Sequence, residues 1–173
     1  RSIICPKKPS SVNASTRYYL ENFADSQADE VTSLNDADAA IIKLSTPHED
    51  LHPNFFFGSR QQEGDIDFKP TLHAAKRVRA LSEKMPTIAV IQMSRPAVVT
   101  DIINDLDGLY VDLGVSDDLM INAISSQIET EGTLPFELPR SMHAVRSQRP
   151  DYPSDSQDAL FQVGADYKNN EGL

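Results

Sequence analysis

The sequence predicts an α/β protein: a three-layer sandwich around an open, doubly wound, mostly parallel sheet of the flavodoxin-like kind. The main observation is the segment 87–96, whose first five residues, Thr-Ile-Ala-Val-Ile, form a short unbroken apolar run. A strand that is buried on both faces has this pattern, as central strands of parallel sheets do. Similar runs lie before and after it, at 39–44 and 108–113. Helical patterns fill the intervals, and this alternation is typical of doubly wound sheets.

Bulk composition limits the classes of partner. A length of 173 residues suits one domain with a sizeable core. The formal net charge of -10 argues against nucleic acid or an anionic membrane surface as a partner, because both would repel the chain. No apolar run is long enough to span a bilayer.

Cys5 has no second cysteine to pair with, and we expect it in a mobile end. The chain starts at Arg1 without a basic-then-apolar leader, which indicates a processed or excised segment.

Five segments precede residue 70. Residues 1–16 are rich in proline, lysine and serine and predict an irregular lead-in. The aromatic-rich segment 17–23 is consistent with an edge strand, and the acidic segment 25–38 predicts a solvated turn with a short helix. Residues 39–44 predict a buried strand. The segment 46–68 shows no period, and a loop of this length in a compact domain is more often functional or covered by a partner than idle.

Helical patterns follow the loop. Residues 70–84 carry an apolar stripe at helical spacing, and Pro70 suits the first turn of a helix. The same kind of stripe runs through 97–106, and the strand 109–113 comes next. Ser116 and the two aspartates after it predict a helix that runs to about residue 127, because a serine oxygen can cap a helix and acids favour its positive end.

The last third of the chain is less regular. Residues 132–138 predict a short strand that Pro135 interrupts, so we expect it at a sheet edge. Residues 139–173 are loop-rich, and order there would need packing against something else. We expect right-handed crossovers, and in an open α/β sheet of this kind we expect a ligand beyond the carboxyl ends of the parallel strands. Because the loop 46–68 leaves one of those ends, we expect a functional site at that edge.

The loop carries the candidate chemistry. Its acidic residues are Glu49, Asp50, Glu63, Asp65 and Asp67. Without other information, any one of these carboxylates is expected simply to be solvated. Residues 55–57, three consecutive phenylalanines, indicate a packing plug or a contact patch for a missing partner more than a sugar platform. His48 and His52 lie in a proline-bearing loop rather than on one helix face, so we expect no metal site. No phosphate-binding loop or nucleophile elbow occurs.

Six short motifs follow one another along the chain. They are D-A-D-A-A-I-I at 36–42, S-R-P at 94–96, L-G-V-S-D at 113–117, G-T-L-P-F-E-L-P-R-S at 132–141, D-Y-P at 151–153 and L-F-Q-V-G at 160–164. In this order they resemble the second domain of glycoside hydrolase family 3, over roughly residues 17–164. The sequence Ala-Asp-Tyr at 165–167 departs from the second glycine and leucine usual in the family.

The resemblance implies an α/β-sandwich domain that normally packs on an eight-fold βα barrel. That barrel carries the aspartate nucleophile of a retaining mechanism. This chain has no tryptophan and is too short to include a barrel, so residues 17–164 resemble the C-terminal domain alone, with 165–173 as a tail. In the family, the loop after the strand that matches 39–44 often supplies the acid/base carboxylate. Two residues match its patterns: Glu49, in Pro-His-Glu, and Glu63, in Glu-Gly-Asp.

The expected function follows from that resemblance. Retaining glycosidases use two carboxyls, and the proton donor needs a raised pKa, which burial beside apolar groups provides. We expect Glu49, ahead of Glu63, to be the acid/base, with His48 and Asp65 binding substrate and no cofactor. The substrates would be β-linked glucosides or xylosides, and the partner would be the N-terminal barrel domain. The isolated domain should be inactive, because the covalent step needs the nucleophile. A soluble periplasmic or secreted location is slightly favoured.

An alternative hypothesis is a free-standing flavodoxin-like binding or docking module that takes no part in catalysis. It requires the loop 46–68 and the tail to be ordered and self-contained. The domain hypothesis instead expects them to be mobile, or to cover an apolar face that the absent barrel leaves open. Fold alone does not decide between these hypotheses.

Overall fold

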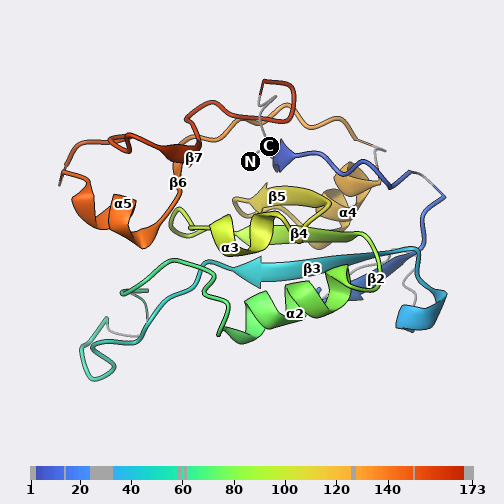
Figure 1. Ribbon diagram of the computed structural model, residues 1–173, viewed down its shortest axis with the longest axis horizontal. Coiled ribbons are helices and arrows are strands. Elements are labelled where there is room, and N and C mark those ends of the chain that lie inside the picture. The colour runs from blue at the N-terminus through green and yellow to red at the C-terminus, as the bar shows by residue number, and fades with distance from the viewer. Residues whose placement is uncertain are drawn as a thin grey trace.

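The computed structural model describes residues 3–13, 15–23, 33–57, 60, 62–125, 128–149 and 151–169 (Figure 1). The strands are β1 (Ile3–Lys7), β2 (Tyr18–Glu21), β3 (Ala39–Ser45), β4 (Thr87–Gln92), β5 (Gly108–Asp112), β6 (Leu138–Pro139) and β7 (Ala159–Phe161). The helices are the 3-10 helix η1 (Leu34–Asp36) and the α-helices α2 (His73–Ser82), α3 (Thr100–Ile103), α4 (Asp117–Ile124) and α5 (Met142–Ser147). This order confirms the predicted α/β class.

The main sheet has five strands in the order β1-β5-β4-β3-β2. The pairs β2–β3, β3–β4 and β4–β5 are parallel, whereas β1 pairs antiparallel with β5 at one edge. The three unbroken apolar runs are therefore the three inner strands, as predicted. The segment 17–23 supplies the edge strand β2, which confirms that expectation as well. Of the acidic segment 25–38, residues 25–32 lie outside the described residues, and η1 is the short helix expected there.

Two expectations about the N-terminus are wrong. Residues 3–7 of the expected irregular lead-in form β1, and Cys5 is buried within it rather than placed in a mobile end. The short apolar group Ile-Ile-Cys forms a strand because it packs beside β5. The flanking prolines and lysines made this strand hard to recognise in the sequence. Pro6 is tolerated because an edge strand can leave one side of its backbone unpaired. The register also shifts between Ile4 and Lys7.

Helices cover both faces of the sheet, and two buried clusters separate the layers (Figure 1). Alternate residues of a strand point to opposite faces. In β4, Ala89 and Ile91 therefore join the cluster with α2 and α3, whereas Ile88 and Val90 join the cluster with α4. This arrangement confirms the three-layer sandwich. No helix in the described part of the chain is long and apolar enough to cross a membrane.

The helices are shorter than predicted, for identifiable reasons. The helix expected at 97–106 is reduced to α3 because the backbone of Val98 is already paired with the loop. The Val98 N–H donates to the Ile66 carbonyl at 3.1 Å, and the Val98 carbonyl accepts from the Phe68 N–H at 3.1 Å. Similarly, α2 begins at His73, after the proline that was expected in its first turn. Ser116 lies at the N-cap of α4, but its side chain makes no capping hydrogen bond, and α4 ends at Ile124.

The C-terminal third forms a second, two-stranded sheet. Strands β6 and β7 pair antiparallel. The strand expected at 132–138 is wrong except at its last residue, because β6 spans only Leu138–Pro139. Between them is α5, where the Ser141 hydroxyl accepts from the Ala144 N–H at 3.1 Å. Phe161 is fully buried in the main core. This part of the chain, expected to be loop-rich, gains its order from packing on the rest of the domain.

Candidate active-site loop

The loop 46–68 leaves the carboxyl end of β3, as the sequence predicts (Figure 1). The ends of β4 and β5 lie at the same edge, where a pocket of about 350 Å³ is lined by Ser45, Gln92 and Asp112 among others. Asp112 is not available to a ligand, because its Oδ1 accepts from the N–H groups of Gly114 and Val115 and its Oδ2 lies 3.4 Å from Lys43 Nζ. The candidate catalytic groups at this edge of the sheet therefore come from the loop.

Arg95, which follows the central strand, holds both ends of the loop together. Its Nη2 donates to the carbonyl oxygens of Pro47 and Glu63, each at 3.2 Å, and its Nη1 donates to the Gly64 carbonyl at 3.4 Å. The Thr46 hydroxyl in turn donates to the Arg95 carbonyl at 2.9 Å. The outgoing and returning halves of the loop are thus fixed to one guanidinium.

Glu49 and Glu63, the two candidate acid/base residues, lie opposite each other on these halves. They form an isolated antiparallel bridge in which the Glu49 N–H donates to the Glu63 carbonyl at 2.8 Å. The Glu49 side chain crosses the backbone of Gly64, where an added Cβ would lie 2.6 Å from the Cβ of Glu49. Gly64 also has a φ of +74°, a conformation that favours glycine. Any other residue at 64 would displace Glu49.

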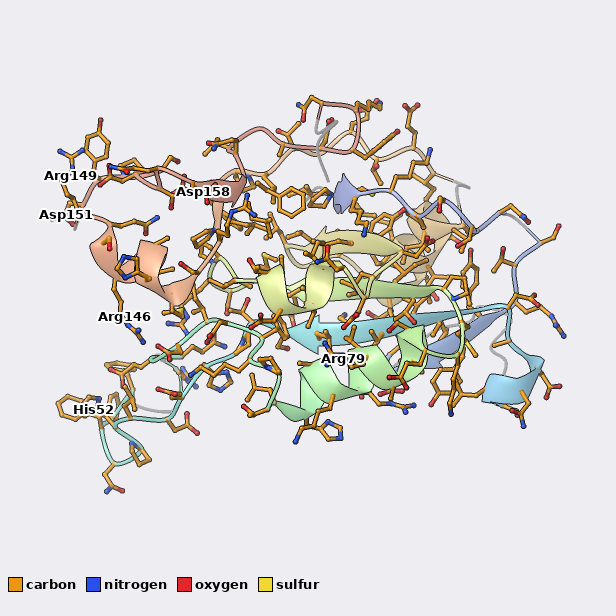
Figure 2. All side chains as sticks on the ribbon, viewed as in Figure 1. His52, Arg79, Arg146, Arg149, Asp151 and Asp158 are labelled. Atoms are coloured by element: carbon orange, nitrogen blue, oxygen red, sulfur yellow. The ribbon has the colours of Figure 1, made fainter. Side chains whose placement is uncertain are left out.

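The two carboxylates have different surroundings. Glu49 is exposed, and its charge contributes to the raised pKa of Lys69, whose main cause is the hydrogen bond to Asp65. The Glu63 side chain is 28% exposed, and its Oε2 lies 2.7 Å from His52 Nδ1. Figure 2 shows His52 out on the loop, away from the sheet. Within the described ranges, no three His, Cys, Asp or Glu residues are grouped as metal ligands would be.

Asp65 joins the loop to its neighbours. Its Oδ2 accepts from Lys69 Nζ at 2.7 Å and its Oδ1 from Arg146 Nη2 at 2.6 Å. The Lys69 hydrogen bond and, after it, the Arg146 contact lower the pKa of Asp65 below its ordinary value. Asp65 is therefore held as a charged anchor. His48 is exposed on the outgoing half of the loop. The expected roles of Asp65 and His48 in substrate binding stay predictions.

The three phenylalanines project into solvent. The exposed fractions of Phe55, Phe56 and Phe57 are 68%, 92% and 54%. Phe56 and Phe57 make an edge-to-face contact with ring centroids 4.7 Å apart. A packing plug inside this domain is therefore wrong. The remaining expectation, a patch that contacts another surface, stays a prediction.

A second cavity that the sequence did not predict lies beside the loop. It has a volume of about 430 Å³ and is bounded by Gly64 and Arg95 on one side and by residues of the segment 135–154 on the other. Glu137, in its lining, is 5% exposed. No signal in the sequence pointed to it, because a charged residue between two apolar residues such as Phe136 and Leu138 is usually outside the core.

Comparisons with known proteins show to which class of protein the chain is similar. The chain matches no protein-family model. It is 38% identical over 154 residues to "Periplasmic beta-glucosidase/beta-xylosidase" of Dickeya chrysanthemi, covering 86% of this chain and 24% of that protein. It is 31% identical over 162 residues to "Beta-glucosidase C" of Emericella nidulans, covering 90% and 26%. The chain therefore spans about a quarter of the length of these relatives.

A solved structure supports the fold. The exo-1,3/1,4-beta-glucanase of a Pseudoalteromonas species aligns with a TM-score of 0.65 and 16% identity, covering 99% of this chain and 28% of that one. The fold and these similarities together define an α/β-sandwich domain that is similar to part of known β-glucosidases. The chain belongs to glycoside hydrolase family 3 and corresponds to its C-terminal domain. Its division into 1–16, 17–164 and 165–173 stays a prediction.

Proposed function

We propose that this chain is the C-terminal domain of a retaining β-glycosidase that hydrolyses β-linked glucosides or xylosides. In this role it shapes the sugar pocket and supplies the acid/base carboxylate. The observation that carries the proposal is the pairing of Glu49 and Glu63 on a single braced loop at the carboxyl edge of the sheet. The names of the similar proteins, a periplasmic β-glucosidase/β-xylosidase among them, supply the substrate class and favour a periplasmic or secreted location.

The nucleophile belongs to a separate N-terminal barrel domain in this proposal. A retaining enzyme holds its two carboxyl groups about 5 to 5.5 Å apart, so the loop must lie against the surface that carries the nucleophile. The exposed phenylalanines 55–57 favour such a contact, because burying them would remove a large apolar area from water.

Glu49 is the preferred acid/base. A proton donor must exchange its proton freely, and a carboxylate tied to a cation favours the charged form. The Glu63 carboxylate is already engaged by the His52 ring nitrogen, which lies 2.7 Å away. Glu49 lies over Gly64 with its side chain open to solvent. Contact with the barrel would bury it and supply the apolar surroundings that a donor needs.

The test compares the purified chain with the full-length enzyme that carries it, on an aryl β-glucoside and an aryl β-xyloside. We expect turnover from the full-length enzyme and none from the chain alone, because the covalent step needs the nucleophile. Circular dichroism and thermal melting of the isolated chain establish that it is folded in the assay. Turnover by the folded chain at a rate near that of the full-length enzyme would contradict the proposal.

A further inference from the structure

The cavity beside the loop has the dimensions of a small-molecule site. Its volume is about 430 Å³, and binding pockets for small ligands occupy roughly 300–1,000 Å³. Its apolar lining includes Phe136, Met142, Val145 and Tyr152. Most of these belong to α5 and its flanks, so the cavity lies between that helix and the returning half of the loop. Figure 2 shows Arg146 of α5 pointing toward the loop that carries His52.

One buried carboxylate in this lining lacks a complete set of partners. Glu137 is 5% exposed, and its Oε1 accepts from Gln148 Nε2 at 2.8 Å and from the Ser156 N–H at 2.9 Å. Its Oε2 is buried and has no hydrogen-bond partner within the described residues. An unsatisfied buried oxygen is costly, so a ligand with a donor group at this position would be favoured.

The same lining carries an unsatisfied donor. Arg95 Nε is buried and also has no partner within the described residues, although the other guanidinium nitrogens hold the loop. The lining thus contains one anionic residue, Glu137, and one cationic residue, Arg95. The charges of these two residues cancel. A neutral ligand with hydroxyl groups fits this lining, because a hydroxyl can both donate to Glu137 and accept from Arg95.

The apolar walls suit the remaining surface of such a ligand. Aromatic and apolar side chains pack against flat apolar faces, and a pyranose ring presents C–H faces between its hydroxyl groups. Tyr152 is positioned beside the Arg149 guanidinium, which lies 4.1 Å from its ring centroid. A hydroxylated ring is thus matched both by the polar pair and by the walls.

The position of the cavity indicates which ring it takes. Gly64 lies in its lining and is the residue next to Glu63 and beneath Glu49. In a retaining glycosidase, the acid/base stands beside the leaving-group oxygen. We propose that the cavity binds the sugar ring on the leaving-group side of the cleaved bond, with Glu137 and Arg95 hydrogen-bonded to its hydroxyls. This assignment rests on the proposed function.

The experiment uses the full-length enzyme and isothermal titration with two ligands, glucose and a sulfur-linked β-glucosyl disaccharide that the enzyme does not cleave. Val145→Trp fills the cavity from α5. We expect it to weaken binding of the disaccharide at least tenfold and to leave glucose binding unchanged, because only the second ring enters the cavity. The matched control Val163→Trp, on an exposed residue outside the lining, should change neither affinity.

A second variant keeps the assignment testable if Val145→Trp fails to fold. Glu137→Gln keeps an acceptor for Gln148 and Ser156 but replaces Oε2 with an amide, which cannot accept a hydroxyl proton. We expect a three- to tenfold weaker disaccharide affinity with a melting temperature close to that of the parent. Disaccharide affinity that both variants leave within twofold, or equal loss for both ligands, would overturn the assignment. Failure of the proposed function itself would appear differently, as absence of both hydrolysis and glucose binding in the parent enzyme.

Discussion

Arg146 Nη2 lies 2.6 Å from Asp65 Oδ1, so helix α5 is ion-paired to the returning half of the loop that carries the candidate acid/base residues. Lys69 Nζ contacts the other oxygen of the same carboxylate at 2.7 Å. Figure 2 shows Arg146 directed from α5 toward this loop. The position of the loop therefore depends in part on Arg146, which lies far from it in the sequence, and this dependence can be tested.

Replacing Asp65 with Asn should loosen the returning half of the loop. The folded-state pKa of Asp65 is depressed, chiefly by the Lys69 hydrogen bond. Its stabilising contribution is therefore present above the ordinary value of 3.8 and is lost as pH falls through the lower folded pKa. We expect faster amide exchange at Ile66 and Phe68 in the variant at pH 7, and a difference from the parent that disappears on acidification. Identical exchange at pH 7 would show that the ion pair does not hold the loop.

Replacing Arg95 with Lys should disorganise the base of the loop. A lysine ammonium cannot reach the carbonyls of Pro47, Glu63 and Gly64 with the geometry of a planar guanidinium. Hydrogen bonds to charged groups contribute about 1.5–3 kcal/mol each, so we expect a loss of about 2–3 kcal/mol in the free energy of unfolding. Arg79→Lys is the matched control, because Arg79 is exposed and makes a single 3.4 Å ion pair with Asp105. Equal, small effects in urea denaturation of the two variants would refute a bracing role for Arg95.

Replacing Gly64 with Ala should displace Glu49. Gly164→Ala is the control, because Gly164 has a φ of +83° but no neighbour within 4 Å of an added Cβ. A left-handed conformation costs a non-glycine residue about 1–2 kcal/mol, which both variants should lose. We expect a larger loss for Gly64→Ala, because its Cβ also collides with Glu49. Thermal melting measures the difference, and equal losses would mean that the Glu49 side chain moves aside without cost.

The Cys5 thiol should be unreactive in the folded chain. Burial raises the pKa of Cys5 to about 12, against an ordinary value of 9.0, and the thiolate is the reactive form. We expect negligible alkylation by iodoacetamide at pH 8.5 and complete alkylation after denaturation in guanidinium. Rapid alkylation without denaturant would show that β1 detaches from the sheet.

The inner strands of the sheet were predictable from the unbroken apolar runs. Strands β3, β4 and β5 are buried on both faces, so their own residues are enough to identify them as strands. Strand β1 was missed because its three apolar residues are flanked by Pro6 and Lys7, and only the pairing with β5 makes them a strand. The shortening of α3 has a similar origin: the backbone of Val98 pairs with the loop rather than continuing a helix.

For the candidate site, the position of the loop was predictable from the sequence, but most of its contacts were not. The position of the loop follows from the order of the strands, and Glu49 and Glu63 were identified from the resemblance to the family. Their mutual pairing and the role of Arg95 depend on backbone carbonyls, which carry no side-chain signal in a sequence. The cavity at Glu137 was missed because residues 135–154 come close to Gly64 only in the folded chain.

The most direct test of the central claim, that this loop supplies the acid/base, uses Glu49→Gln and Glu63→Gln in the full-length enzyme. The substrates are an alkyl β-glucoside, whose departure needs a proton, and a dinitrophenyl β-glucoside, whose departure does not. We predict that Glu49→Gln slows the alkyl substrate by about 10²–10⁴-fold, leaves formation of the glycosyl-enzyme from the dinitrophenyl substrate nearly unchanged, and regains turnover of that substrate when azide is added. Parent-like hydrolysis of the alkyl substrate by both variants would contradict the claim.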